Sequence, residues 1–239
     1  ISKLTEIREI HMIEKALEYL KRDTLLHVDM LETIKRGIGE VIYAGNDGVV
    51  LLNSGYTYMI SVESEETLER ACSVIGKRPE VICAHNALFT PLLQEKYGYK
   101  HQMECFQCAY MSGEKLDLRA SEGIELKPLT IEQLDFVVEN YSHNPDRNYI
   151  LERLEAGMIG AFYGNEIVGF VGTHTEGTMG MLEIVPAYRR RGIAYTLEAA
   201  MINYTLDKGF IPHAHIVTTN EASIKLQEKV GMNFSDKTA

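Results

Sequence analysis

The spacing of apolar residues along the chain alternates between two periods, and each change predicts a new helix or strand. Near the start, Ile7, Ile10 and Leu17 recur at helical spacing, so a helix is predicted over about 5–22 and a second over about 24–36. Beyond these, runs of β-branched and aromatic residues bounded by Gly, Asn and Asp predict strands. The other elements of the first half are expected as three strands, a helix, a strand, a helix and a strand, at about 41–44, 49–52, 56–62, 65–75, 81–85, 88–97 and 103–111.

The second half repeats this order of elements. Its elements are expected as a strand, two helices, three strands, a helix, a strand, a helix and a short strand, at about 124–128, 131–141, 147–156, 158–163, 166–174, 178–185, 191–208, 213–219, 221–230 and 232–236. The segment 93–99 also matches the segment 226–232. Unless this short match is a coincidence, the chain is a tandem of two related α/β domains, each with an α+β mixed sheet. A polar stretch at about 112–121 places the boundary between residues 1–116 and 117–239.

Composition excludes several classes of function. The chain has 24 basic and 34 acidic residues, a net charge of −10, and a general nucleic-acid binder would need a basic face instead. No apolar run approaches the roughly 20 residues of a membrane span, and no signal peptide opens the sequence. We therefore expect a cytoplasmic protein that binds neither membrane nor nucleic acid.

The four cysteines do not form a metal-binding pattern. Cys105 and Cys108 share a strand-like run, where residues three apart point to opposite faces, and no second pair of Cys or His stands at metal spacing. Reduced, half-buried thiols are the expected state, in preference to a zinc site or a disulfide, and no metal is expected.

A candidate anion site follows the strand predicted to end at Val185. After Pro186 come Arg189, Arg190 and Arg191, and then Gly192, Ile193 and Ala194 open a long helical pattern. The first turn of a helix leaves backbone N–H groups unpaired and favours negative charge, so phosphates bind there. Gly192 and Ala194 have short side chains, so a phosphate can approach the backbone. Arg189 and Arg191 can then bind its outer oxygens. The alternative is an ordinary turn with solvated arginines.

A second motif follows at Asn220 and Ser223 and ends at Gly231. Together with the spacing Arg189-x-x-Gly192-x-Ala194, it resembles the GNAT superfamily of CoA-dependent N-acyltransferases over about residues 122–236. The resemblance implies acetyl-CoA as co-substrate, with its diphosphate on the N–H groups of residues 190–194. It also implies backbone contacts from Ile184 and Pro186 to the pantetheine or the acyl carbonyl. Asn220 and Ser223 would contact the pantetheine, although Asn is equally a good helix N-cap.

Three residues are candidates for the chemistry that this resemblance implies. Glu183 lies on the strand beside the expected thioester, where a carboxylate can remove a proton from an attacking amine. His174, at the end of the preceding strand, is the second candidate base. Plainer alternatives are a surface glutamate and a loop histidine without a role. Gln227 occupies the position where many family members carry a tyrosine acid, and a glutamine cannot supply a proton.

The first half lacks the anion site. After its third strand stand Glu63, Glu65 and Glu66, and three carboxylates would repel a diphosphate. We predict that this half does not bind CoA, which is similar to glycine N-acyltransferase-like tandems with one degenerate copy. The second half is expected to transfer an acetyl or short acyl group to a primary amine of a small molecule or amino acid. The alternative is a non-catalytic CoA-binding sensor or partner module; a homodimer is left open.

Overall fold

The computed structural model describes residues 3–118, 122–141, 143 and 146–238. The chain divides into two compact units. Unit 1 comprises Ile1–Cys108, Ile216–Thr219 and Phe234–Ala239, and unit 2 comprises Ala109–His215 and Asn220–Asn233. The division therefore falls after Cys108 rather than at the predicted 116/117, and unit 1 includes two later segments. Residues 119–121 of the predicted boundary stretch lie outside the described residues.

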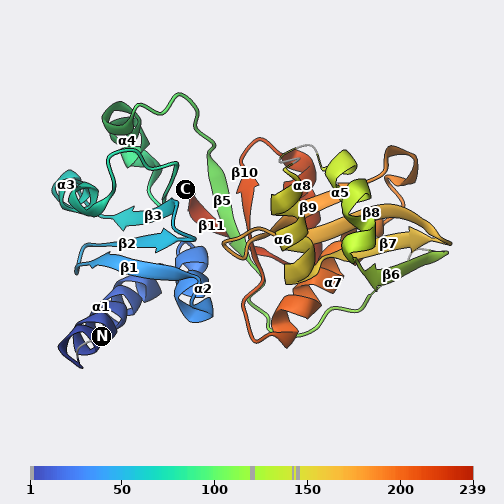
Figure 1. The fold of residues 1–239 in the computed structure, drawn as a ribbon, viewed down its shortest axis with the longest axis horizontal. Coiled ribbons are helices and arrows are strands. Elements are labelled where there is room, and N and C mark those ends of the chain that lie inside the picture. The colour runs from blue at the N-terminus through green and yellow to red at the C-terminus, as the bar shows by residue number, and fades with distance from the viewer. Residues whose placement is uncertain (1–2, 119–121, 142, 144–145, 239) are drawn as a thin grey trace. The chain divides into compact units, whose positions relative to one another are not determined.

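Unit 1 is a four-stranded mixed sheet with helices on both faces (Figure 1). Its elements are α1 (Lys3–Leu20), α2 (Val28–Arg36), β1 (Gly39–Ala44), β2 (Gly48–Asn53), β3 (Thr57–Val62), α3 (Glu65–Val74), β4 (Val81–Ala84) and α4 (Thr90–Tyr97). The first three strands form an antiparallel meander, and β4 pairs parallel to β3. Alternation along β2 builds both cores, because Val49 and Leu51 pack with α1 and α2 while Val50 packs with α3 and α4.

The third sheet of the chain has the strand order β10-β5-β11. These strands are β5 (Cys105–Ala109), β10 (His213–Val217) and β11 (Asn233–Thr238). Within unit 1, the N–H of Thr218 donates to the carbonyl oxygen of Glu104 at 3.0 Å. The rings of Phe106 and Phe234 meet edge to face, with 6.0 Å between centroids. Pairing between strands so distant in sequence explains why unit 1 includes two late segments.

Unit 2 has an antiparallel sheet in the order β6-β7-β8-β9, again covered on both faces (Figure 1). Its elements are β6 (Ile124–Pro128), α5 (Leu134–Asn140), α6 (Arg147–Gly157), β7 (Ile159–Tyr163), β8 (Glu166–Thr173), β9 (Met179–Ile184), α7 (Ile193–Asp207) and α8 (Glu221–Val230). Phe170 and Met181 pack with α5 and α6 in one core. On the opposite face, a Cβ at Gly169 would lie 3.4 Å from Leu197 of α7. Both faces of this sheet are therefore buried.

The two units share an element order but differ at one strand pair. In unit 1, β3 pairs with β4 from Thr57↔Val81 to Ile60↔Ala84. In the second half of the chain, the corresponding strands β9 and β10 belong to different sheets. The parallel pairing of β3 with β4 therefore has no counterpart between β9 and β10.

The predicted fold class is confirmed: both halves are mixed α/β structures with the expected succession of helices and strands. Local interactions shift the ends of some helices from their predicted positions. The helix expected from residue 24 begins only at Val28, and the one expected from 131 begins as a 3₁₀ turn, Ile131–Gln133, under a capping box from Thr130. All four cysteines are free thiols.

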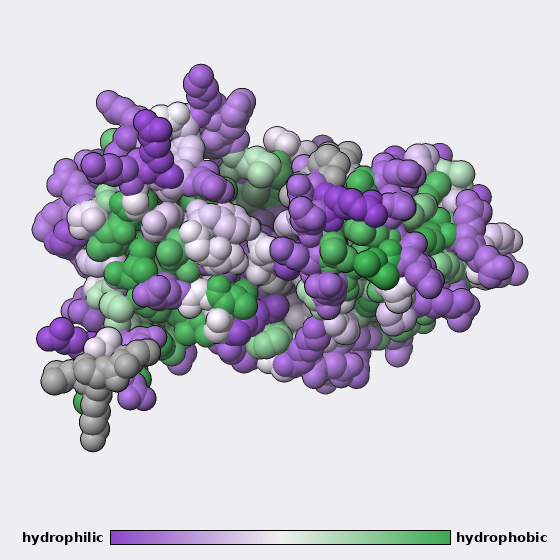
Figure 2. Space-filling view, viewed as in Figure 1, coloured by the Kyte–Doolittle hydropathy of each residue, from purple (hydrophilic) through white to green (hydrophobic). Residues whose placement is uncertain are grey.

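The surface of each unit is largely polar on the face that Figure 2 shows, with apolar patches between the hydrophilic side chains. In the part of the chain that the structure describes, no helix combines the length and the apolar character needed to cross a bilayer.

Candidate active site

The segment between β9 and α7 forms a loop of exposed backbone donors. After a 3₁₀ turn, Pro186–Tyr188, the loop passes through Arg190 at φ +61° and Gly192 at φ +83°. Gly192 is the N-cap of α7, and it has no side chain to cap the first turn. Left-handed residues beside an uncapped helix N-terminus turn successive N–H groups toward a common point, which suits an anion. The predicted diphosphate loop, from Arg190 through Ile193 to Ala194, therefore has the required backbone form.

Two of the arginines in this loop donate hydrogen bonds to nearby backbone carbonyl oxygens. Arg189 donates from Nε to the carbonyl oxygen of Ile184 at 2.9 Å, and Arg191 donates from Nη2 to that of Ala187 at 3.1 Å. The Arg191 guanidinium also lies over the Tyr188 ring, 5.0 Å from its centroid. Both arginines are exposed. A ligand that bonds to the Ile184 carbonyl oxygen would therefore share it with Arg189 or displace Arg189.

The equivalent helix start in unit 1 is closed to anions. The N-cap of α3 is Ser64, whose hydroxyl accepts the N–H of Thr67 at 3.2 Å. Glu65 and Glu66 occupy the first turn. A capped and acidic N-terminus offers neither donors nor favourable charge to a phosphate.

A cleft of about 310 Å³ opens beside the loop of unit 2. Its lining residues come from α5, β8, β9 and the start of the loop: Phe136, Glu139, Asn140, Gly169, Phe170, Glu183, Ile184, Val185, Pro186 and Arg189. Of the predicted residues, the cleft thus brings together Glu183, Ile184, Pro186 and Arg189. Glu183 pairs with Phe170 across the strands, so both side chains stand on the α5 face of the sheet.

A bulge in β9 sets the direction of Glu183. The register runs from Phe170↔Glu183 to Gly172↔Gly180, so two residues of β9 oppose one of β8, and Met181 adopts φ +50°. Such a conformation is strained for a side chain other than glycine, and bulges are common beside active sites. Gly169 allows the strands to meet here, because a Cβ on it would lie 2.8 Å from the carbonyl oxygen of Glu183.

Tyr141, at the C-terminal end of α5, was not singled out from the sequence. Burial, and then the negative charges of Glu183 and Glu176, raise its pKa to about 12. Its hydroxyl therefore remains protonated within the electrostatic reach of Glu183. Only packing brings these residues together, since the C-cap of α5 and the strand β9 are distant in sequence.

His174 does not line the cleft. Its Nδ1 lies 2.7 Å from the hydroxyl of Tyr149, at the opposite end of the β8–β9 pair from Glu183. Burial lowers its pKa, although the charge of Glu176 opposes that shift. Burial alone would raise the pKa of Glu176, but His174, His215 and a hydrogen bond from Thr178 outweigh it and lower the pKa. The interactions of His174 and Glu176 therefore stabilise the turn between β8 and β9.

Gln227 is also turned away from the cleft. Its side chain is 3% exposed and donates from Nε2 to Oε1 of Glu198 on α7. Burial raises the pKa of Glu198 to about 7, against the opposing effect of the Gln227 hydrogen bond. Oε2 of Glu198 and Oε1 of Gln227 are buried without a hydrogen-bond partner among the described residues. The predicted acid position is therefore part of the α7–α8 contact.

Asn220 has the geometry of a helix cap. Its side-chain oxygen accepts the N–H of Ser223 at 3.1 Å and begins α8. Asn220 is exposed and Ser223 half-buried. The capping interpretation is thus present in the structure, and contacts from both residues to pantetheine stay a prediction.

Comparison with known proteins shows which family the second half of the chain resembles. Residues 126–232 match the model of the Acetyltransferase (GNAT) family. No curated protein matches the chain. Among solved structures, a Drosophila protein is 15% identical with a TM-score of 0.69, and the match covers 95% of this chain and 93% of that one. A GCN5-related N-acetyltransferase-like protein from Streptococcus suis is 17% identical with a TM-score of 0.57, covering 93% and 97%.

The similarity to solved structures spans both units. An acetyltransferase from the GNAT family of Colwellia psychrerythraea is 14% identical with a TM-score of 0.52, and the match covers 98% of this chain and 95% of that one. At such identities the structures show a shared fold. The family match adds that residues 126–232 are similar to the GNAT acetyltransferases, a family whose members take acetyl-CoA or another acyl-CoA as co-substrate.

Proposed function

We propose that unit 2 transfers an acetyl or short acyl group from CoA to a primary amine of a small molecule or amino acid. The observation that carries this proposal is the cleft of about 310 Å³ that joins Glu183 to the start of the arginine loop. An acyltransferase must hold the acyl donor and place a base beside the attacking amine. In this cleft a carboxylate shares the lining with Arg189, the first arginine of the loop that leads to the uncapped N-terminus of α7.

The loop would bind the donor. The N–H groups of Arg190, Gly192, Ile193 and Ala194 would donate hydrogen bonds to the CoA diphosphate, and Arg189 and Arg191 would exchange their bonds to backbone carbonyls for bonds to phosphate oxygens. This exchange frees the Ile184 carbonyl for the pantetheine. Pro186, which has no N–H, can contribute only its carbonyl.

Glu183 would act as the base. The amine nitrogen attacks the thioester carbonyl, Glu183 takes a proton from that nitrogen, and the carbon–sulfur bond then breaks to release the CoA thiolate. Gln227 cannot protonate the thiolate, since glutamine has no acidic proton and this side chain faces Glu198. A water molecule would supply the proton to the thiolate.

The acceptor would arrive as an ammonium ion and lose one proton to solvent before its neutral nitrogen attacks, and Glu183 would take the second proton. Glu139 and Glu183 both line the cleft, and Asn140 adds an amide. Two carboxylates against the single Arg189 favour an ammonium group over a carboxylate. The four free thiols suit a reducing compartment, which supports our proposal of a cytoplasmic enzyme.

Melting temperatures with and without millimolar acetyl-CoA test the proposal. A ligand at about 100 times its dissociation constant adds roughly 2.7 kcal/mol of stability, a shift of several degrees. We expect the shift in the wild type and its loss in the double variant Arg191→Ala, Gly192→Glu. Arg147→Ala with Gly164→Glu is a matched control, because Gly164 is an exposed turn residue at φ +61° outside the loop. No shift in the wild type would overturn the proposal.

A rival function follows from the replacement of the family's tyrosine by Gln227. A protein that kept the CoA loop but lost its acid would be a non-catalytic CoA-binding sensor or partner module. Release of free CoA thiol in the presence of a panel of primary amines separates the two. Donor binding without thiol release above the acceptor-free rate would favour the sensor.

A further inference from the structure

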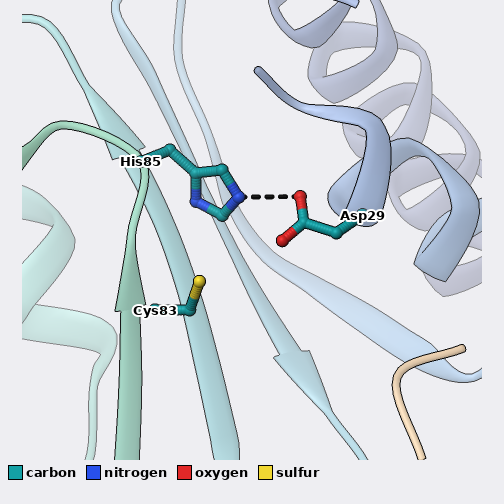
Figure 3. Close-up of side chains that lie close together, drawn as sticks. All are labelled: Asp29, Cys83 and His85. Carbon is teal, nitrogen blue, oxygen red and sulfur yellow. Dashed lines mark hydrogen bonds and ion pairs between the residues drawn. The ribbon is translucent and has the colours of Figure 1, made fainter. Parts of the chain in front are cut away.

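A buried polar cluster in unit 1 takes no part in the proposed reaction. It consists of Asp29 in the first turn of α2, Cys83 on β4, His85 directly after β4, and Gln107 on β5. Cys83 and His85 are two residues apart and so share one face of the strand. Figure 3 shows their side chains converging with Asp29.

The cluster is compact and shielded from water. Nε2 of His85 lies 2.7 Å from Oδ1 of Asp29. Nε2 of Gln107 lies 3.0 Å from Oδ2 of Asp29 and 3.4 Å from Nε2 of His85. The ligand atoms of Asp29, Cys83 and His85 all lie within 4.8 Å of one another. Asp29 and Gln107 are 0% exposed and His85 1%, while Cys83 is half-buried.

Protons alone do not satisfy every polar atom here. The Nε2–H tautomer of His85 can donate to Asp29, but Oε1 of Gln107 is buried without a hydrogen-bond partner among the described residues. Turning the Gln107 amide over, which exchanges its oxygen and nitrogen, would place that oxygen 3.0 Å from a carboxylate oxygen. Two oxygens with only lone pairs repel at this distance unless a cation lies between them.

We propose that Asp29, Cys83, His85 and the turned amide oxygen of Gln107 bind one Zn²⁺ ion. One carboxylate and one thiolate balance the two charges of the ion, and the imidazole and the amide are neutral. Zinc takes four N, O and S ligands at about 2.0–2.3 Å, which places neighbouring ligand atoms roughly 3.3–3.7 Å apart. The 3.0 and 3.4 Å separations around Gln107 are close to this spacing, and the His85–Asp29 contact must widen slightly.

The surroundings of His85 agree with a ligand role. Its other ring nitrogen, Nδ1, lies 3.3 Å from the carbonyl oxygen of Ile60. A histidine that binds zinc commonly donates its second N–H to a backbone carbonyl, which fixes the tautomer. The ion would join α2 to the edge strand β4 and stabilise the unit that lacks a CoA loop.

The test uses the full chain, stripped with a chelator and then titrated with Zn²⁺ and, separately, with Co²⁺. We expect about one ion per chain, and a melting temperature raised by at least about 5 °C at 100-fold excess over the dissociation constant. Cobalt should show four-coordinate visible bands and a thiolate-to-cobalt band in the near ultraviolet. A wild type that retains no metal and shows neither band overturns the proposal.

Variants assign the ligands. Cys83→Ser should lose the thiolate band, whereas Cys72→Ser, which removes a buried thiol of α3 in the same unit, should keep it. Gln107→Leu leaves three ligands and should weaken binding by about tenfold or more, a magnitude known for changes around metal ligands. If Cys83→Ser does not fold, the change in metal affinity of Gln107→Leu tests the proposed site instead. Binding that both variants leave unchanged would place the metal elsewhere and overturn the assignment.

Discussion

Glu183 lies in the cleft because of its position in the register of β8 and β9. Glu183→Gln keeps the size of the side chain and removes the base. We expect kcat to fall by about 10²–10⁴-fold, the usual contribution of a general base. Acetyl-CoA should raise the melting temperature of the variant as it does that of the wild type.

Steady-state kinetics at saturating acetyl-CoA measures this effect. Glu139→Gln, on the opposite wall of the same cleft, is the matched control: it should raise KM for a cationic amine with less effect on kcat. A Glu183→Gln enzyme with unchanged kcat would remove Glu183 from the mechanism.

Glu198 shows what burial does to a carboxyl group without a cationic partner. Its pKa is raised to about 7 by burial, and Gln227 is the one side chain that opposes the shift. When protonated, Oε2 can donate to Oε1 of Gln227 while Nε2 of Gln227 donates to Oε1 of Glu198. This paired acid and amide satisfies both buried oxygens that otherwise have no partner.

Stability should therefore depend on pH through Glu198. The folded chain holds this proton up to about pH 7, whereas an unfolded glutamate loses it near pH 4.3. The contribution is complete below about pH 4.3, is lost as pH rises through 7, and amounts to on the order of 3–4 kcal/mol. Glu198→Gln mimics the protonated pair and should be more stable than the wild type at pH 8.5.

Melting temperatures at pH 5.5 and 8.5 measure this prediction. The difference between the two pH values should shrink in Glu198→Gln but persist in Glu155→Gln, which changes an exposed glutamate of α6. Parallel pH profiles for the wild type and Glu198→Gln would show that Glu198 does not share a proton with Gln227.

At the scale of elements, one strand pair separates the two copies. Where β3 and β4 are hydrogen-bonded, no backbone is left for an extended ligand between them, and the following helix α3 is capped by Ser64. In the sheet of unit 2, β9 is the last strand, so its outer edge offers backbone groups that such a ligand would use. This edge strand and the anion loop follow one another along the chain in unit 2.

Calorimetric titration with acetyl-CoA should accordingly give one site per chain. The double variant Arg191→Ala, Gly192→Glu should abolish that site and reveal no residual one. Two sites in the wild type, or one that survives in the double variant, would mean that unit 1 binds CoA despite Glu65 and Glu66.

Most elements could be predicted from the sequence because their signals are local. The helix α8 begins at its Asn220 cap and ends before Gly231, as the residues themselves indicate. The bulge at Met181 was not predicted, because it depends on a two-against-one pairing with β8. For the same reason, Tyr141 and Glu139 were missed as neighbours of Glu183: only the packing of α5 on the sheet brings them there.

At the scale of the whole molecule, β5 determines which fragments fold. A fragment that begins at residue 118 lacks the middle strand of the third sheet, so β11 loses its partner. We expect this fragment to be insoluble, or to melt well below the full chain, since unpaired strand edges promote aggregation. A full chain cut after expression at the exposed Gly113 keeps every strand and is the control. A soluble, active fragment from residue 118 would contradict this expectation.

The late segment of unit 1 also has a consequence for synthesis in the cell. Residues 234–238 pair within unit 1, yet they leave the ribosome only after all of unit 2 has been made. At about 5–20 residues per second, β5 would wait roughly 5–25 seconds for its partner strand. The part of the protein that is translated first is therefore completed last, and during that interval the nascent chain presents an open strand edge to any chaperone at the exit tunnel.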